Sequence, residues 1–158
     1  MNEIRTLAAI LVAEAAPSTR GPTEEMRAVA WTVRNRWLHV KTEHGKRDQR
    51  WFGKGDTLRS IIEHGMEFHG AKTDRYRLVP AAASSLREPG DRQFALDCLV
   101  VAEEVLRRPA PVIPGRDGKY PYVWFQKGKS EPSPRATKSP VFLGKHHFWS
   151  FAPGGERA

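Results

Sequence analysis

The sequence predicts an α+β protein that is mostly helical, with a small antiparallel β region near its C-terminus. Apolar residues recur at the spacing of an α-helix in four segments before residue 109. Aromatic and β-branched residues dominate 120–126 and 141–151 instead, which is typical of strands. At 158 residues and without an internal repeat, the chain is expected to form one domain over 1–152 and a loose tail over 153–158.

The first two helices are expected at about 3–16 and from residue 24 onward. Ile4, Leu7 and Leu11 share one face of the first helix. Thr23 caps the second helix, and two glutamates in its first turn suit the positive end of the helix dipole. The apolar face of the second helix carries Met26, Val29, Ala30, Val33 and Trp37.

The middle of the chain is less regular. Residues 41–56 are polar, basic and contain glycine, so we expect a loop there. Thr57 caps a short helix that runs to about His64, and 65–89 is expected to be mostly irregular.

A strong helix follows, from a cap at Asp91 to Arg108, where a run of prolines stops it. Two strands then flank residues 127–140, which are rich in Ser, Pro and Lys and are expected to form a long loop. The single cysteine, Cys98, excludes an internal disulfide and is expected to be a buried, inert thiol.

The charge of the chain points to an acidic partner. The net charge is +8 and the pI is near 10.0, which suits nucleic acid, an anionic membrane or an anionic cell-wall polymer. No stretch reaches the roughly 20 apolar residues of a transmembrane segment. The N-terminus resembles a signal peptide in having Arg5, the apolar run 7–12 and the small-residue site Ala13-Glu14-Ala15. The apolar run is short, however, and the charged segment before it also contains the acidic Glu3. We therefore expect a helix and no classical signal peptide.

Glu14 is the most informative residue. It follows the apolar stretch 4–13 and lies three residues beyond Leu11, so it should project from the apolar side of the helix. Desolvation there disfavours the charged form of a carboxylate. A carboxylic acid that keeps its proton near neutral pH is what general acid catalysis of glycosidic cleavage requires. The alternative is a glutamate that ends the helix and points into solvent.

Three sequence blocks follow one another along the chain. The first contains Ala13-Glu14-Ala15, a turn ending in Gly21-Pro22, and AVAWTVRNR over 28–36. The second is TLRSII over 57–62 with MEF over 66–68, and the third is YVWFQK over 122–127 with FLGKHHFW over 142–149. In this order, over about 4–149, they resemble the SleB/CwlJ cell-wall hydrolases, the spore-cortex-lytic type of peptidoglycan enzymes.

The resemblance implies a lysozyme-like fold and places Glu14 at the family's single catalytic glutamate. The implied reaction is cleavage of peptidoglycan glycan strands between N-acetylmuramic acid and N-acetylglucosamine, with Glu14 protonating the bridging oxygen. A muramidase would then use a second carboxylate and water. A lytic transglycosylase would instead let Glu14 accept the proton of the sugar's own 6-hydroxyl and close a 1,6-anhydro ring. The resemblance favours this second outcome, with no cofactor and no metal.

Glu67 leaves hydrolysis as an alternative, because it places a second carboxylate where the family usually has Gln. A second carboxylate about 6.5–9.5 Å from Glu14 could activate a water, and a shorter gap would fit a retaining mechanism. The alternative is a solvated carboxylate.

Other matched residues are implied in substrate binding: Glu67, Phe68, Tyr76, Tyr122, Phe125, Gln126, Lys127 and His146. Aromatic rings could stack on sugars, although in a strand about half of them must face the core. Gln126 and Lys127 could bind N-acetyl or lactyl groups, although the family prefers Asn where this chain has Lys127. His146 could orient Glu14 or serve a structural role, and Asn35 and Arg36 are expected to tie the second helix to the rest of the fold.

Two other classes of protein share some of these sequence features. A metal-dependent nuclease could use His64, His69, His146 and His147, but no recognised ligand spacing occurs. A non-catalytic module binding the cell wall or nucleic acid would also be basic and aromatic. We expect peptidoglycan as the partner and no nucleic acid.

The expected setting follows from the absence of a classical signal peptide. The protein would be made in the cytoplasm and would act as a monomer in the periplasm or cell wall after non-classical export. A phage lysin or an injected antibacterial effector fits this route, and an effector would have a neighbouring immunity protein.

Overall fold

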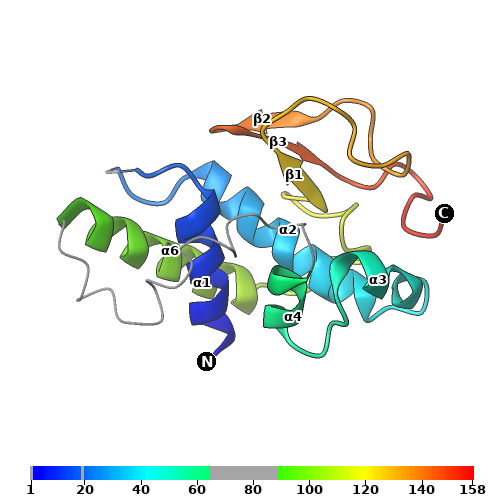
Figure 1. The fold of residues 1–158 in the computed structure, drawn as a ribbon, viewed down its shortest axis with the longest axis horizontal. Coiled ribbons are helices and arrows are strands. Elements are labelled where there is room, and N and C mark those ends of the chain that lie inside the picture. Colours follow the sequence, from blue (N-terminus) through cyan, green and yellow to red (C-terminus); the bar gives the residue numbers. More distant parts are fainter. Residues whose placement is uncertain (1, 19, 65–88) are drawn as a thin grey trace.

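Figure 1 shows the computed structural model, which describes residues 2–18, 20–64 and 89–158. Its helices are α1 (Glu3–Glu14), α2 (Glu24–Val40), the 3₁₀ helix η1 (Gly45–Asp48), α3 (Gln49–Phe52), α4 (Leu58–Glu63) and α6 (Pro89–Arg107). The strands are β1 (Trp124–Gln126), β2 (Val141–Leu143) and β3 (His146–Trp149). The prediction of a largely helical α+β protein with a small antiparallel sheet near the C-terminus is confirmed. The prediction for 65–89 lies almost wholly outside the described residues.

Helix α1 is the centre of the helical layer. It packs against α6, α2 and α4, and Figure 1 shows α6 on one side of it and α4 on the other. Residues 6–12 of α1 are all buried, because neighbouring helices cover it on several sides. Cys98 of α6 is fully buried in the same core, as predicted.

Side-chain caps define where three helices begin. The Asn2 side chain accepts from the backbone N–H of Arg5, Thr23 accepts from Met26, and Thr57 accepts from Ser60. Each cap satisfies one of the N–H groups that a first helical turn leaves without a partner. The predicted caps at Thr23 and Thr57 are therefore confirmed.

The start of α6 differs from the prediction. The helix begins at Pro89, and Asp91 lies in its first turn where a cap was expected. Proline is favoured at a first helical position because its φ is already helical and its missing N–H needs no partner. Asp91 still suits the positive helix end.

The predicted strand over 141–151 is instead a hairpin, which turns at Gly144 and Lys145. Gly144 has φ of +60°, a conformation that glycine adopts at little cost, and Leu143 pairs with His146 across the turn. The strand order is β1-β3-β2, all antiparallel, with Trp124 opposite Trp149.

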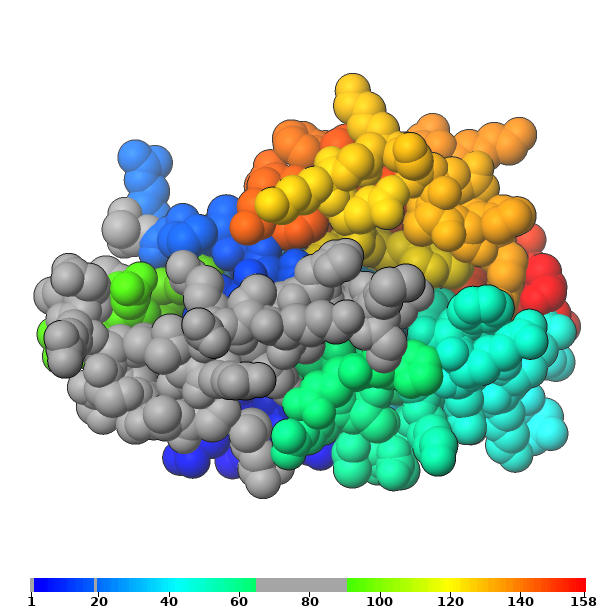
Figure 2. All heavy atoms as spheres, in the orientation of Figure 1, coloured from blue at the N-terminus to red at the C-terminus, as the bar shows by residue number. Residues whose placement is uncertain are grey.

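Residues 41–56 were predicted as a loop, but they contain η1 and α3. Buried Phe52 holds this segment to the core. Asp48 holds it to the C-terminal region, because Arg135 donates two hydrogen bonds of 2.9 and 2.8 Å to its carboxylate. In Figure 2 the cyan-to-teal atoms of this segment meet the gold and red atoms of the C-terminal region.

The tail over 153–158 is not loose as predicted. Gly155 and Glu156 are buried. Arg135 Nε donates to the carbonyl of Gly155 at 2.7 Å, and Arg116 pairs with Glu156 at 3.0 Å. These bonds fold the tail back onto the domain. Across the described parts of the chain, no helix is long and apolar enough to cross a membrane.

Asp48 is the buried acid of a charged cluster that also contains His39 and Arg135. His39 Nε2 lies 2.7 Å from its Oδ2, and both residues are almost completely buried. Burial alone would raise the pKa of Asp48, but the hydrogen bonds from Arg135 and His39 outweigh burial and lower that pKa below its usual value. The ionised carboxylate therefore stabilises the fold at neutral pH.

Replacing Asp48 with Asn should lower the free energy of unfolding by about 3 kcal/mol at pH 7, because Arg135 and His39 lose a buried anion. A group whose pKa is lowered by folding stabilises the protein above its unfolded-state pKa, and the contribution disappears as the pH falls through the folded-state pKa. The difference in the free energy of unfolding between wild type and D48N should therefore become smaller below about pH 3.9. Urea unfolding at a series of pH values measures it.

The exposed pair of Glu43 and Lys46 provides the control, so E43Q should leave stability unchanged. An equal loss in D48N at pH 7 and at pH 3 would contradict a role for the Asp48 charge.

Candidate active site

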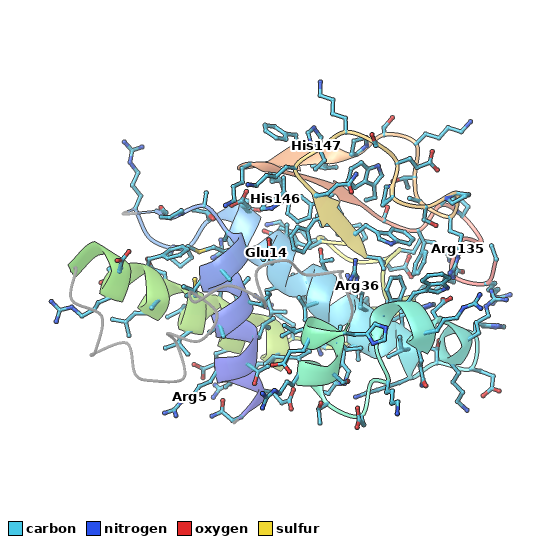
Figure 3. The ribbon with its side chains drawn as sticks, in the orientation of Figure 1. Arg5, Glu14, Arg36, Arg135, His146 and His147 are labelled. Atoms are coloured by element: carbon cyan, nitrogen blue, oxygen red, sulfur yellow. The ribbon has the colours of Figure 1, made fainter. Side chains whose placement is uncertain are left out.

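Glu14 is the last residue of α1, at the junction between the helical layer and the sheet. Its side chain is 13 % exposed, so it is largely desolvated but still accessible. Figure 3 shows it beneath the sheet, close to His146. Nε2 of His146 lies 3.8 Å from Oε2 of Glu14. The central, buried helix thus brings one carboxyl group to a surface where the sheet supplies an imidazole.

His146 begins β3 and is held from several sides. Its Nε2 faces Glu14, and its Nδ1 lies 3.3 Å from Oε2 of Glu25. The ring of Phe125 on β1 meets the imidazole edge-on, with 5.0 Å between centroids. His146 is 2 % exposed, so the imidazole has one well-defined position between two carboxylates.

Glu25 is the site residue that the sequence analysis missed. It is 3 % exposed and accepts the backbone N–H of Ala16 at 2.6 Å and that of Lys145 at 2.5 Å, besides facing Nδ1 of His146. The three donors come from the turn after α1 and from the β2–β3 hairpin, while Glu25 itself belongs to α2. One buried carboxylate therefore joins the segment that follows Glu14 to the strand that carries His146.

The hydrogen bonds of Glu25 determine its charge. Burial alone would raise its pKa, but the bonds from His146, Ala16 and Lys145 together lower the pKa below its usual value. An ionised carboxylate only accepts hydrogen bonds, so Nδ1 of His146 must carry the hydrogen in this arrangement. In the neutral imidazole, Nε2 then presents its lone pair to Glu14.

A signal for Glu25 was present in the sequence. Glu24 and Glu25 were both explained by the helix dipole, but only Glu25 lies three and four residues before Ala28 and Val29, on the buried face of α2. Glu24 instead turns outward, toward Arg27 and the hydroxyl of Tyr120. A charged residue in phase with an apolar face needs a buried partner, and the sequence does not reveal that partner.

The structure separates the other predicted substrate-binding residues. Phe125 lies beside His146, on the face of the sheet that meets Glu14. Tyr122 is only 8 % exposed and packs on Phe148, so its ring belongs to the core and offers no open face to a sugar.

Gln126 pairs with His147 and donates to the carbonyl of Ser130. Lys127 is exposed, and its carbonyl accepts from His147. Glu67, Phe68 and Tyr76 lie outside the described residues.

Asn35 and Arg36 tie α2 to the chain before β1, as predicted. The amide of Asn35 donates to the carbonyls of Tyr120 and Tyr122 at 3.0 and 2.9 Å, and Nε of Arg36 donates to that of Val123 at 2.6 Å. These bonds give the otherwise irregular chain before the sheet a defined place on α2.

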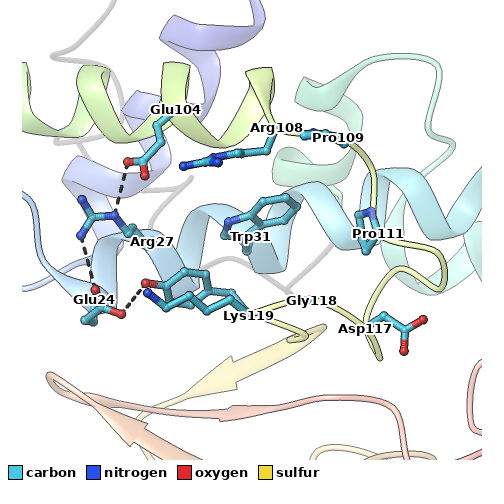
Figure 4. A pocket seen from close by; sticks show the side chains of 11 residues that line it. Glu24, Arg27, Trp31, Glu104, Arg108, Pro109, Pro111, Asp117, Gly118 and Lys119 are labelled. Atoms are coloured by element: carbon cyan, nitrogen blue, oxygen red, sulfur yellow. Dashed lines mark hydrogen bonds and ion pairs between the residues drawn. The ribbon is translucent and has the colours of Figure 1, made fainter.

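A pocket of about 560 Å³ lies elsewhere, between α2, the end of α6 and the loop 109–120 (Figure 4). We call it the α2–α6 pocket. It shares no lining residue with the cluster of Glu14, Glu25 and His146. Within 2–18, 20–64 and 89–158, no group of three His, Cys, Asp or Glu side chains is arranged to hold a metal ion.

Comparison with protein-family models, with curated proteins and with solved structures gave no match.

Gly144 controls the space around Glu25. A Cβ at this position would lie 2.1 Å from Oε2 of Glu25, whereas a Cβ at Gly154 would meet nothing within 4 Å. Both glycines have positive φ, so both alanine variants carry the backbone penalty of about 1 kcal/mol. G144A should cost at least ~1 kcal/mol more than G154A, because it also displaces a buried, hydrogen-bonded carboxylate. Chemical denaturation of both variants measures the difference, and equal losses would show that Glu25 adjusts freely.

Proposed function

We propose that this protein cleaves peptidoglycan glycan strands between N-acetylmuramic acid and N-acetylglucosamine, with Glu14 as the general acid and base. The observation that carries the proposal is a largely desolvated carboxyl group at the end of a buried central helix, with an imidazole 3.8 Å away. A helical layer with a small sheet beside the carboxyl-bearing helix supports a lysozyme-like architecture. The resemblance to the SleB/CwlJ family supports the same substrate.

The proposed reaction needs one carboxyl group. Glu14 gives its proton to the bridging oxygen, and the bond between that oxygen and C1 of the muramoyl sugar breaks. The positive charge that develops at C1 faces the carboxylate left on Glu14. Glu14 then accepts the proton of the 6-hydroxyl on the same sugar, and the freed oxygen bonds to C1. The products are a 1,6-anhydro-muramoyl end and a free 4-hydroxyl, and Glu14 recovers its proton without consuming water.

Among the described residues, the carboxylate that Glu14 shares His146 with, Glu25, is unsuited to hydrolysis. An inverting hydrolase needs a second carboxylate that holds a water molecule. Glu25 is ionised, but it is 3 % exposed and its oxygens already accept from Ala16, Lys145 and His146. It therefore lacks the room that a base needs to hold and activate a water molecule. Its role in the proposal is to hold His146.

His146 supports the proton chemistry of Glu14. With its hydrogen on Nδ1, the buried ring directs Nε2 toward Oε2 of Glu14 and so limits the positions that the carboxyl group can take. Hydrogen bonds at catalytic groups often shorten when substrate binds, so a contact of 3.8 Å in the free protein suits this role.

Glu14→Gln should lower the rate of glycan cleavage by about 10²–10⁴-fold, since a carboxamide cannot donate the required proton. Mass spectrometry of digested peptidoglycan is the measurement, and the expected wild-type products end in 1,6-anhydro-muramic acid. The exposed Glu43→Gln serves as the matched control. Reducing ends would make the protein a muramidase, and unchanged cleavage by E14Q would exclude Glu14 as the acid.

Nitrogen-15 NMR of the histidine rings tests the role of Glu25. Neutral His146 should carry its hydrogen on Nδ1 in the wild type and should lose that preference in Glu25→Ala, with kcat reduced by ~10-fold or more and KM unchanged. His147 is an internal control, because its Nδ1 faces the carbonyl of Lys127 and does not depend on Glu25. A His146 tautomer that is the same in both proteins would contradict the positioning role.

A further inference from the structure

The α2–α6 pocket has the size and the preorganised walls of a ligand site. Its volume of about 560 Å³ falls within the range of about 300–1,000 Å³ that is usual for small-molecule sites. It lies on a different side of α2 from Glu25, since Glu24 lines the pocket while its neighbour Glu25 is turned toward His146. A ligand there would be bound separately from the bond that Glu14 acts on.

Trp31 is the aromatic surface of the pocket. Figure 4 shows its indole in the middle of the lining residues. The guanidinium of Arg34 lies 5.0 Å from the centroid of the indole, and Arg34 is itself buried and donates to the carbonyl of Val105 at 2.6 Å. The indole is thus supported by a fixed cation and has little freedom to move. A preorganised aromatic face favours an apolar or flat part of a ligand.

One wall of the pocket is a chain of linked charges. Arg27 contacts Glu104 at 3.3 Å and Glu24 at 3.4 Å, and the hydroxyl of Tyr120 donates to Glu24. Burial, and then the hydrogen bond to Glu24, raise the pKa of Tyr120, so its hydroxyl keeps its hydrogen. The carboxylate of Glu24 is half-exposed and can accept N–H groups from a ligand.

Two cations that line the pocket have no acidic partner in the described part of the chain. Arg108 and Lys119 both line it, and neither has a carboxylate within 4.0 Å among the described residues. The neighbouring Arg107 is different, because it pairs with Glu103 at 2.6 Å. Arg108 and Lys119 are therefore available to bind an anionic group of a ligand.

We propose that the α2–α6 pocket binds the stem peptide of peptidoglycan. Amide N–H groups of the peptide would donate to Glu24, an aliphatic side chain would lie on Trp31, and a peptide carboxylate would bind Arg108 and Lys119. A bare glycan keeps a lactyl carboxylate next to the sugar ring, but it lacks the amide N–H groups and the aliphatic side chain that a stem peptide would place on Glu24 and Trp31. A polyphosphate chain has no N–H groups for the Glu24 carboxylate to accept, whereas a peptide has them. This inference rests on the proposed peptidoglycan substrate.

The test measures binding and not cleavage. Glu14→Gln protein is titrated calorimetrically with a soluble disaccharide-tetrapeptide and with the same disaccharide without peptide. The tetrapeptide form should bind at least ~10-fold more tightly, which corresponds to one good charged contact. Arg108→Gln and Trp31→Ala, each added to E14Q, should remove that difference. Arg107→Gln is the matched control and should leave it unchanged, because Arg107 is exposed and paired with Glu103.

Arg108 is exposed, so its variant tests the pocket even if Trp31→Ala disturbs the packing of Arg34. Equal affinity for the two ligands would overturn the inference. A preference for the tetrapeptide form that persists in R108Q would overturn it as well. Tighter binding of a single-stranded oligonucleotide, abolished by R108Q, would overturn it in favour of nucleic acid. Wild-type cleavage of peptide-free glycan tests the proposed function on its own, so failure of one proposal can be told from failure of the other.

Discussion

The buried carboxylate of Glu25 is the interaction on which the arrangement of this protein depends. It accepts N–H groups from the turn after α1 and from the β2–β3 hairpin, and it faces the imidazole of His146. An ionised group that is 3 % exposed is tolerated only with several good hydrogen bonds, so its partners cannot move apart without a large cost. Because Ala16 and His146 are both partners, the distance between Glu14 and the imidazole is determined by the same carboxylate.

Helix α2 anchors other segments of the chain along its whole length. Near its start Glu25 holds the hairpin, in its middle Asn35 and Arg36 bind the chain before β1, and near its end His39 contacts Asp48. At the C-terminal end of α2, Arg135 binds both Asp48 and the C-terminal tail. A sheet of three short strands would have little stability alone. Anchored to α2 at both ends, it presents His146 to Glu14 in a reproducible position.

Consecutive residues of α2 serve two different sites. Glu25 turns inward to the proposed catalytic group, while Glu24 turns outward to Arg27 and Tyr120 in the α2–α6 pocket. Under the proposed function, a polymer would be cleaved on one side of the helix and held by a side branch on the other. The proposed substrate, peptidoglycan, has both a glycan strand and stem peptides, and the net charge of +8 agrees with an anionic partner.

By itself the sequence determined the class of fold, the helix starts at Thr23 and Thr57, the burial of Cys98 and the place of Glu14 at the end of an apolar helix. These follow from spacing and capping, which act between residues close in the chain. Only the tertiary structure decided that Glu25 and not a surface glutamate is the buried partner of His146, that Tyr122 belongs to the core, and that the tail is held by Arg135 and Arg116. These contacts join residues 20 or more positions apart, or depend on a two-residue turn at Gly144. Local patterns carry no information about which distant donor a buried carboxylate will meet.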